Sequence, residues 1–203
     1  ITGNVYGASG TTTESNAYGQ NAAPWAAAVR GSVRTIDFVD RISPLNAQWW
    51  FANFSALTTI KNVENWDLSR CTSLFYTFYN CDALTSLTMQ NVDARNVTTM
   101  QYMFNECSRL EYLDLRGWNT SSCTDFQYTF GTMAALRYIY LDGWSTGHQA
   151  LLNYMFNDNN KLTEIDLTGF DVSRAEYMQY MFNSCEQLAK VNLANWNVES
   201  VID

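Results

Sequence analysis

Three tyrosines and five charged residues near the middle of the chain have the types and the spacing that could form a binding surface. The tyrosines are Tyr112, Tyr138 and Tyr140, and the charged residues around them are Asp114, Arg116, Asp142, Glu164 and Asp166. Tyrosine offers a large contact area at a low cost in side-chain entropy and is enriched in recognition surfaces. These residues therefore predict a patch that binds a protein or a glycan. The alternative is that tyrosine is simply a good strand residue on a solvated sheet.

The same residues give little support for catalysis. Asp114 and Asp166 lie two repeats apart, about 10 Å at strand spacing, whereas an inverting glycosidase needs its carboxyl groups roughly 6.5–9.5 Å apart across a cleft. The chain contains no GxGxxG, P-loop, GxSxG or HExxH motif. The single histidine, His148, has no equivalent in other repeats and is expected in an exposed turn. We predict that the protein is not an enzyme and uses no cofactor and no metal.

A repeat of 26 residues places these side chains. Five positions of the repeat keep the same kind of apolar residue without insertion or deletion. One of them is a phenylalanine, found at Phe78, Phe104, Phe130, Phe156 and Phe182. A unit this short cannot bury its apolar residues alone, so it needs neighbours of the same kind. The periodicity therefore predicts a solenoid in which the phenylalanines form a single column.

Each repeat is expected to hold a short helix, a turn and a strand. Val97, Met100 and Phe104 are spaced i, i+3 and i+7, as on one face of a helix of about two turns. Leu113 and Leu115 alternate with polar neighbours, as in a half-buried strand. The predicted fold class is therefore α/β, a solenoid of 26-residue helix-turn-strand repeats with a parallel sheet on one face.

The chain divides into three regions. Residues 1–24 are rich in small polar residues and are expected to be a flexible or extended segment with one short strand at Ile1–Tyr6. Residues 25–65 are expected to form an N-terminal cap, with a strand between Val33 and Val39, followed by a divergent first repeat. Residues 66–203 hold five full repeats and part of a sixth. Because a natural solenoid rarely ends on a half-repeat, we expect this chain to be one region of a longer protein.

The overall charge and the hydropathy exclude several classes of partner. The net charge of −8 argues against a nucleic-acid groove and against binding to an anionic membrane surface. No apolar run reaches the roughly 18 residues that a membrane span needs. No leader sequence starts the chain, so any signal peptide was removed or lies outside it.

The five cysteines occupy only two positions of the repeat. They are Cys71, Cys81, Cys107, Cys123 and Cys185. The same positions also accept Met, Val, Ala or Asn, which favours free thiols packed in a small buried space. One disulfide between stacked repeats stays open as an alternative, and a metal site is disfavoured because no CxxC occurs.

A second series of tyrosines, one per repeat, precedes each core phenylalanine by two residues. It comprises Tyr76, Tyr102, Tyr128, Tyr154 and Tyr180. Stacking between repeats is the favoured interpretation, and a binding strip on the convex face is the alternative.

The repeats resemble the BspA-type leucine-rich repeats of bacterial surface proteins. The resemblance rests on the pattern that begins at Phe170-Asp171-Val172-Ser173 and continues through Met178, Met181, Phe182, Cys185, Leu188, Val191 and Leu193. It covers roughly Trp50 to the C-terminus, with local departures at Met133, Gln149 and Asn159. The resemblance implies a leucine-rich-repeat-like fold and a secreted, surface-displayed protein that is not an enzyme and is often adhesive.

The leading hypothesis is therefore a recognition or adhesion module at the bacterial cell surface. Its expected partner is a host or bacterial surface protein or a glycan. The alternative is a structural spacer that displays another domain from the cell envelope.

Overall fold

The computed structural model describes residues 29–202 of the chain. The expected N-terminal segment 1–24, with its strand at Ile1–Tyr6, lies outside these residues. The strands are β1 (Thr35–Asp37), β2 (Thr59–Lys61), β3 (Ser86–Thr88), β4 (Tyr112–Asp114), β5 (Tyr138–Tyr140), β6 (Ala150–Leu151), β7 (Glu164–Asp166), β8 (Ala175–Tyr177) and β9 (Lys190–Asn192). A short 3-10 helix, η1 (Val63–Asn65), follows β2.

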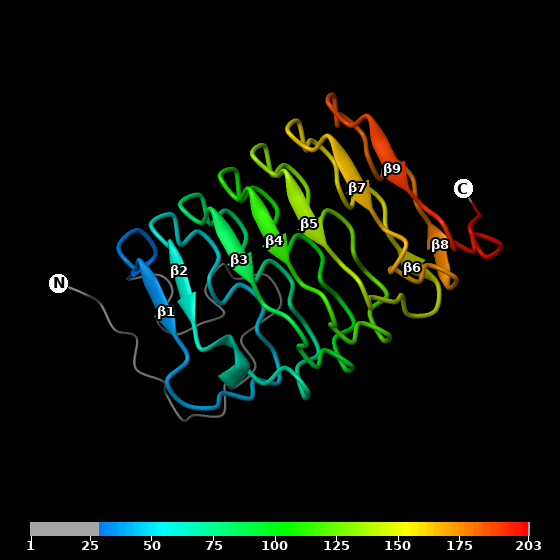
Figure 1. Ribbon diagram of the computed structural model, residues 1–203. Helices are drawn as coiled ribbons and strands as arrows, with labels where there is room; N and C mark the ends of the chain where they lie inside the picture. The colour runs from blue at the N-terminus through cyan, green and yellow to red at the C-terminus, as the bar shows by residue number, and fades with distance from the viewer. Residues whose placement is uncertain (1–28, 203) are drawn as a thin grey trace.

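The chain winds into a coil whose turns, here called rungs, stack along one axis. Strands β1 to β5, β7 and β9 follow one another along one face of the coil, while β6 and β8 pair on another (Figure 1). Every strand pair is parallel, and Tyr112 lies opposite Tyr138 in the β4–β5 pair. One rung is therefore 26 residues long, which confirms the repeat and the solenoid that the sequence predicts.

The fold is a parallel β-solenoid, so the predicted α/β class with a helix in each repeat is wrong. Residues 66–202 contain no α-helix. Where the helix was expected, main-chain N–H groups bond to the next rung instead of four residues back: Leu74 N–H donates to Thr99 C=O at 3.0 Å, and Phe78 N–H to Met103 C=O at 2.9 Å. Isolated parallel bridges, such as Thr99 with Asp125, run along the same face. The segment is thus a series of turns bonded from rung to rung.

Left-handed residues explain why no helix forms. Tyr102 has φ +57° and Glu106 has φ +63°, and the equivalent positions of the other rungs share this conformation. A right-handed helix cannot pass through such a residue, and the conformation costs an L-amino acid roughly 1–2 kcal/mol. Two such residues in each repeat break the chain into single turns. The hydrogen bonds and ring contacts between rungs hold them in place.

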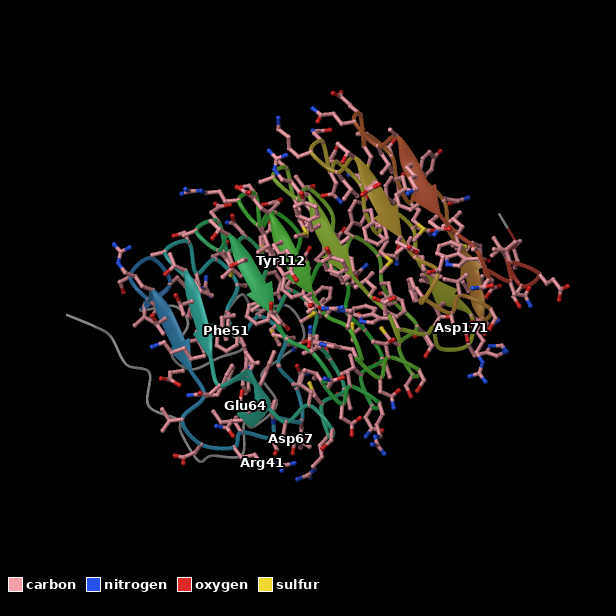
Figure 2. The ribbon with its side chains drawn as sticks, viewed as in Figure 1. Arg41, Phe51, Glu64, Asp67, Tyr112 and Asp171 are labelled. Carbon is pink, nitrogen blue, oxygen red and sulfur yellow. The ribbon has the colours of Figure 1, made fainter. Side chains whose placement is uncertain are left out.

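The core phenylalanines stack in one column along the coil. Phe104 lies between Phe78, with ring centroids 5.3 Å apart, and Phe130, with centroids 6.0 Å apart, and the rings of each pair are nearly parallel. The column begins at Phe51, labelled in Figure 2, and ends at Phe182. The prediction of a single phenylalanine column is therefore confirmed.

The second tyrosine series also stacks. The ring centroids are 5.0 Å apart between Tyr102 and Tyr128 and 4.7 Å apart between Tyr128 and Tyr154, and the rings are nearly parallel. Trp49 extends the stack at one end, 4.1 Å from Tyr76, and Tyr180 closes it at the other. The preferred interpretation, stacking between repeats, is confirmed. The stack also accounts for tyrosine at a left-handed position, because the ring contacts offset the strain.

All five cysteines are free thiols, and four of them are buried. Three donate their S–H to the carbonyl oxygen of a phenylalanine in the preceding rung, as Cys107 does to Phe78 at 3.1 Å. Burial raises the pKa of the Cys71 thiol to about 11 and also raises the pKa of Cys123. These thiols are therefore packing groups that are poor nucleophiles at neutral pH.

In native protein, we expect a maleimide to label Cys185 first and the other four cysteines only after unfolding. Cys185 is the one cysteine that is not fully buried, and thiolate character and access together set the rate of alkylation. Peptide mass spectrometry over a time course in buffer and in urea measures this order. Native-state labelling of Cys107 as fast as Cys185 would contradict the packing described here.

Candidate functional site

Four of the predicted site residues meet on the outer face of the strands. Tyr138 and Tyr140 on β5 are exposed to 54% and 36%, on either side of the buried Ile139. Glu164 and Asp166 on β7 are also exposed, on either side of the buried Ile165. The strand alternation that the sequence predicts therefore brings two tyrosines and two carboxylates to the same surface.

These four residues line a shallow depression of about 170 Å³, here called the strand-face groove. It is formed by residues 137–140, by β7, and by Lys190 and Asn192 of β9. Tyr138 and Tyr140 form one side, and the charged and amide side chains of β7 and β9 form the other. The groove thus joins an aromatic surface to a polar one.

The groove lies where the sheet is interrupted. β5 belongs to the sheet of β3 and β4, whereas β7 pairs only with β9. At neighbouring boundaries Leu115 N–H donates to Tyr140 C=O and Leu167 N–H to Asn192 C=O, both at 3.0 Å. At the β5–β7 boundary, which the structure describes in full, the equivalent Leu141 N–H and Asp166 C=O are not hydrogen-bonded to each other.

The interruption is local. Tyr138 N–H donates to Glu111 C=O at 3.1 Å, but the equivalent pair one rung on, Glu164 N–H and Arg137 C=O, is not bonded within the described chain. The rungs rejoin just past β5, where Gly143 N–H donates to Gly169 C=O at 2.9 Å. Four peptide groups at the β5–β7 boundary, beside the groove, therefore lack their usual ladder partners.

The charged side chains of the groove already have partners. Glu164 pairs with Lys190 at 3.6 Å, and Arg137 with Glu111 at 3.9 Å, both in exposed positions. Asp166 accepts from Thr168 N–H and from Asn192 Nδ2, and the Thr168 bond is the main reason that the pKa of Asp166 is lowered. Two acids, Glu164 and Asp166, and two bases, Arg137 and Lys190, line the groove, so their charges balance.

Asp114 is not part of that surface, although the sequence places it there. It is only 1% exposed and accepts hydrogen bonds from Arg116 Nε at 2.9 Å, Arg116 Nη2 at 2.6 Å and Gln90 Nε2 at 2.6 Å. The Arg116 guanidinium, more than the Gln90 amide, lowers the pKa of Asp114 despite burial. Asp114 is thus a buried anion that orders its neighbours.

This cluster supports the aromatic side of the groove. The Arg116 guanidinium lies 5.2 Å from the centroid of the Tyr140 ring, a cation–π contact. The ring centroid of Tyr112, a residue labelled in Figure 2, lies 5.7 Å from that of Tyr140, and the Tyr112 hydroxyl lies beside the Asp114 carboxylate. Tyr112 is half-buried, so it positions Tyr140 more than it offers a surface of its own. Asp142, the last predicted site residue, is exposed at the exit of β5.

The sequence was compared with protein families and with curated proteins. A family model described as "Mycoplasma protein of unknown function, DUF285" matches residues 46–138 and residues 113–203. Together the matches run from residue 46 to residue 203, which is more than half of the chain. The chain belongs to this family. The comparison with curated proteins finds no match.

The description of the DUF285 family assigns no activity. In the described part of this DUF285 chain, no group of three His, Cys, Asp or Glu residues is arranged to hold a metal ion. No helix formed by the described residues is long and apolar enough to cross a membrane. What the groove offers is an aromatic face, fixed polar side chains and open peptide groups, which together suit reversible binding.

Sequence reasoning missed three residues of the DUF285 groove: Arg137, Lys190 and Asn192. A signal was present for two of them. Lys190 and Asn192 occupy the same repeat positions as Glu164 and Asp166 one rung earlier, so the outward positions of the strands extend to β9. Arg137 precedes β5 and has no such positional signal. Gln90, which bonds Asp114, was also missed because it lies outside the strands.

Replacing Asp114 by asparagine is expected to destabilise the DUF285 chain by about 2 kcal/mol at pH 7, because it removes a buried, charge-assisted bond to Arg116. The pKa of Asp114 is lowered on folding. Its stabilisation is therefore present above the unfolded-state pKa of about 3.9 and is lost as the pH falls further. Urea unfolding of both proteins from pH 7 down to pH 2 measures this, and the difference should shrink below pH 4.

Asp142→Asn is the matched control for this experiment, because Asp142 is exposed at the adjoining turn. It should leave stability at pH 7 almost unchanged. A difference between wild type and Asp114→Asn that is independent of pH would contradict an ionised Asp114 in the cluster.

Proposed function

We propose that this DUF285 chain is a non-enzymatic recognition module that binds a protein or glycan ligand through the strand-face groove. The observation that carries the proposal is the exposed Tyr138 beside an interrupted strand ladder. An exposed tyrosine gives a ligand contact area at low entropic cost. Open peptide groups and fixed polar side chains beside it offer the few directional bonds on which binding sites rely for specificity.

We further propose display at the bacterial cell surface, with a host or bacterial surface protein or glycan as partner. The resemblance of the repeats to BspA-type surface proteins supports this location, and the mention of Mycoplasma in the family description supports a bacterial source. An extended coil suits such a role, because stacked rungs hold one face of outward side chains at fixed spacing. The net charge of −8 disfavours nucleic acid as the partner.

A structural spacer is the second candidate, and the continuous stacking favours it. The phenylalanine column and the tyrosine stack run through successive rungs. This continuous stacking should make the coil stiff along its axis. A spacer needs no ligand, whereas a recognition module does. Binding experiments therefore separate the two.

We expect the full 203-residue chain to bind members of a panel of immobilised extracellular-matrix proteins and glycans, and Tyr138→Ala to weaken that binding at least roughly tenfold. Tyr138 is exposed and makes no hydrogen bond that packing requires, so the variant should fold. Surface plasmon resonance measures the affinity, and circular dichroism checks the fold.

Tyr180→Ala is the matched control. Tyr180 is equally exposed, at 60%, but it belongs to the tyrosine stack and not to the groove, so this variant should bind like wild type. Equal binding by wild type and Tyr138→Ala would remove the groove from the proposal. If the chain bound no member of the panel, the structural spacer would be favoured.

A further inference from the structure

We propose that the strand-face groove binds a single uncharged sugar residue within a larger glycan. This inference rests on the proposed recognition function and names its ligand class. The juxtaposition that carries it is an exposed aromatic ring, Tyr138, next to the β5–β7 boundary, where two ladder bonds are missing, with the Asp166–Asn192 pair alongside.

The size of the groove limits what it can hold. At about 170 Å³ it is smaller than the roughly 300–1,000 Å³ of a site for a drug-sized ligand. One sugar ring fits that space, and the rest of a glycan would extend over the exposed strand face.

The charges of the groove disfavour a charged ligand. Glu164 is paired with Lys190, and Arg137 with Glu111. Asp166 is held by Thr168 N–H and Asn192 Nδ2. An anionic or cationic group entering the groove would compete with one of these pairs and would meet a charge of its own sign. An uncharged ligand avoids both penalties.

The polar groups suit hydroxyls. A hydroxyl both donates and accepts, and neighbouring hydroxyls on a sugar ring can bridge a donor and an acceptor at once. The β5–β7 boundary beside the groove has such pairs: Leu141 N–H with Asp166 C=O, and Glu164 N–H with Arg137 C=O, neither of them closed by a ladder bond among the described residues. The Asn192 amide and the Asp166 carboxylate add a planar donor and acceptor.

The aromatic side supplies the apolar contact. A sugar ring presents one face of C–H groups, and these pack against an aromatic ring without needing a hydrogen bond. Tyr138 is more than half exposed, and Tyr140 is fixed beside it by the Arg116 guanidinium. A ring that packs on Tyr138 therefore has its hydroxyls directed to the polar side of the groove.

A peptide strand fits the same place poorly. Peptides that add to a sheet need a free strand edge with alternating donors and acceptors over several residues. β5 and β7 are already paired on their other sides with β4 and β9, and the interruption closes at the Gly143–Gly169 bond. The opening is a short gap in a ladder and offers no edge for a strand.

The test uses the full 203-residue chain on an array that carries neutral oligosaccharides, sialylated and sulfated oligosaccharides, and matrix proteins before and after enzymatic deglycosylation. We expect binding to neutral oligosaccharides, competition by the free monosaccharide, and little change between about 0.1 and 1 M NaCl, because charge screening should not matter. Tyr138→Ala and Asn192→Ala should each lower the affinity at least tenfold, while Tyr180→Ala should not.

A second measurement reads the open peptide groups directly. Hydrogen exchange at Leu141 and Glu164 should be faster than at Leu115 and Lys190 in the free chain, since the latter two donate ladder bonds. Saturation with the bound oligosaccharide should slow exchange at Leu141 and Glu164 only.

The outcomes separate this inference from the function on which it rests. Preference for acidic glycans with loss of binding at high salt would overturn the uncharged ligand. Binding to deglycosylated protein that Tyr138→Ala abolishes would overturn the sugar while supporting recognition through the groove. The absence of binding to every member of the array would overturn both.

Discussion

Replacing Phe104 by alanine is expected to destabilise the chain by about 3–5 kcal/mol, the range typical of a fully buried phenylalanine. The Phe104 side chain has no exposed surface and its ring is sandwiched between Phe78 and Phe130. The change leaves a cavity that neighbouring rungs cannot fill, because hydrogen bonds between successive rungs fix their separation. Urea unfolding followed by tryptophan fluorescence measures the loss.

Phe182→Ala is the matched control, because it makes the same change at the last position of the same column. Phe182 is only partly buried and stacks on a single neighbour, Phe156. In a solenoid each rung is stabilised mainly by its two neighbours, so this substitution should cost less than half as much. Equal losses from the two variants would contradict a column that is stabilised from both sides.

The periodicity of the sequence was sufficient to predict how the rungs stack, because a repeat without insertions leaves only one register for stacking. It predicted the phenylalanine column and the stacking of the second tyrosine series. It also placed Tyr138, Tyr140, Glu164 and Asp166 on one face, since strand alternation fixes the direction of each side chain. These inferences depend only on spacing along the chain.

The predicted helix failed because the same spacing fits a different backbone. Val97, Met100 and Phe104 are buried in the structure, but single turns separated by left-handed residues bury them as well as a helix would. Tyr102 and Glu106 are not residues that usually mark a left-handed position. Their conformation is stabilised by ring stacking and by bonds to the next rung, which are tertiary contacts that local propensity does not report.

The candidate site was only partly predictable for a similar reason. Asp114 and Asp166 occupy equivalent outward positions, yet Asp114 is buried by Arg116 and Gln90 whereas Asp166 is exposed. Which outward position becomes covered depends on long side chains folding back over the sheet. The interruption between β5 and β7, which forms the groove, has no counterpart in the apolar pattern, since the 26-residue spacing continues unchanged across it.

One departure from the repeat pattern proves structural. Asn159 stands where other repeats have Cys107 or Cys185, and it is fully buried. Its Nδ2 donates to Phe130 C=O and to Phe156 C=O, both at 2.8 Å, and its Oδ1 accepts from Met133 N–H at 3.0 Å. The Cys107 thiol makes one equivalent bond, to Phe78 C=O. A single amide therefore makes three bonds, two of which link its rung to the preceding one.

Asn159→Ala is accordingly expected to destabilise the chain by about 2–4 kcal/mol, because it leaves buried peptide groups without partners. Asn159→Cys should lose no more than about half of that, because a thiol can donate to Phe130 C=O and Met133 N–H can then bond to the same carbonyl. The equivalent bond exists one rung earlier, where Cys107, at the repeat position of Met133, donates its N–H to Phe104 C=O. Thermal unfolding by calorimetry compares the two variants with wild type. If alanine proved no worse than cysteine, Asn159 would be filling space only, and the amide bonds between the rungs would contribute little to stability.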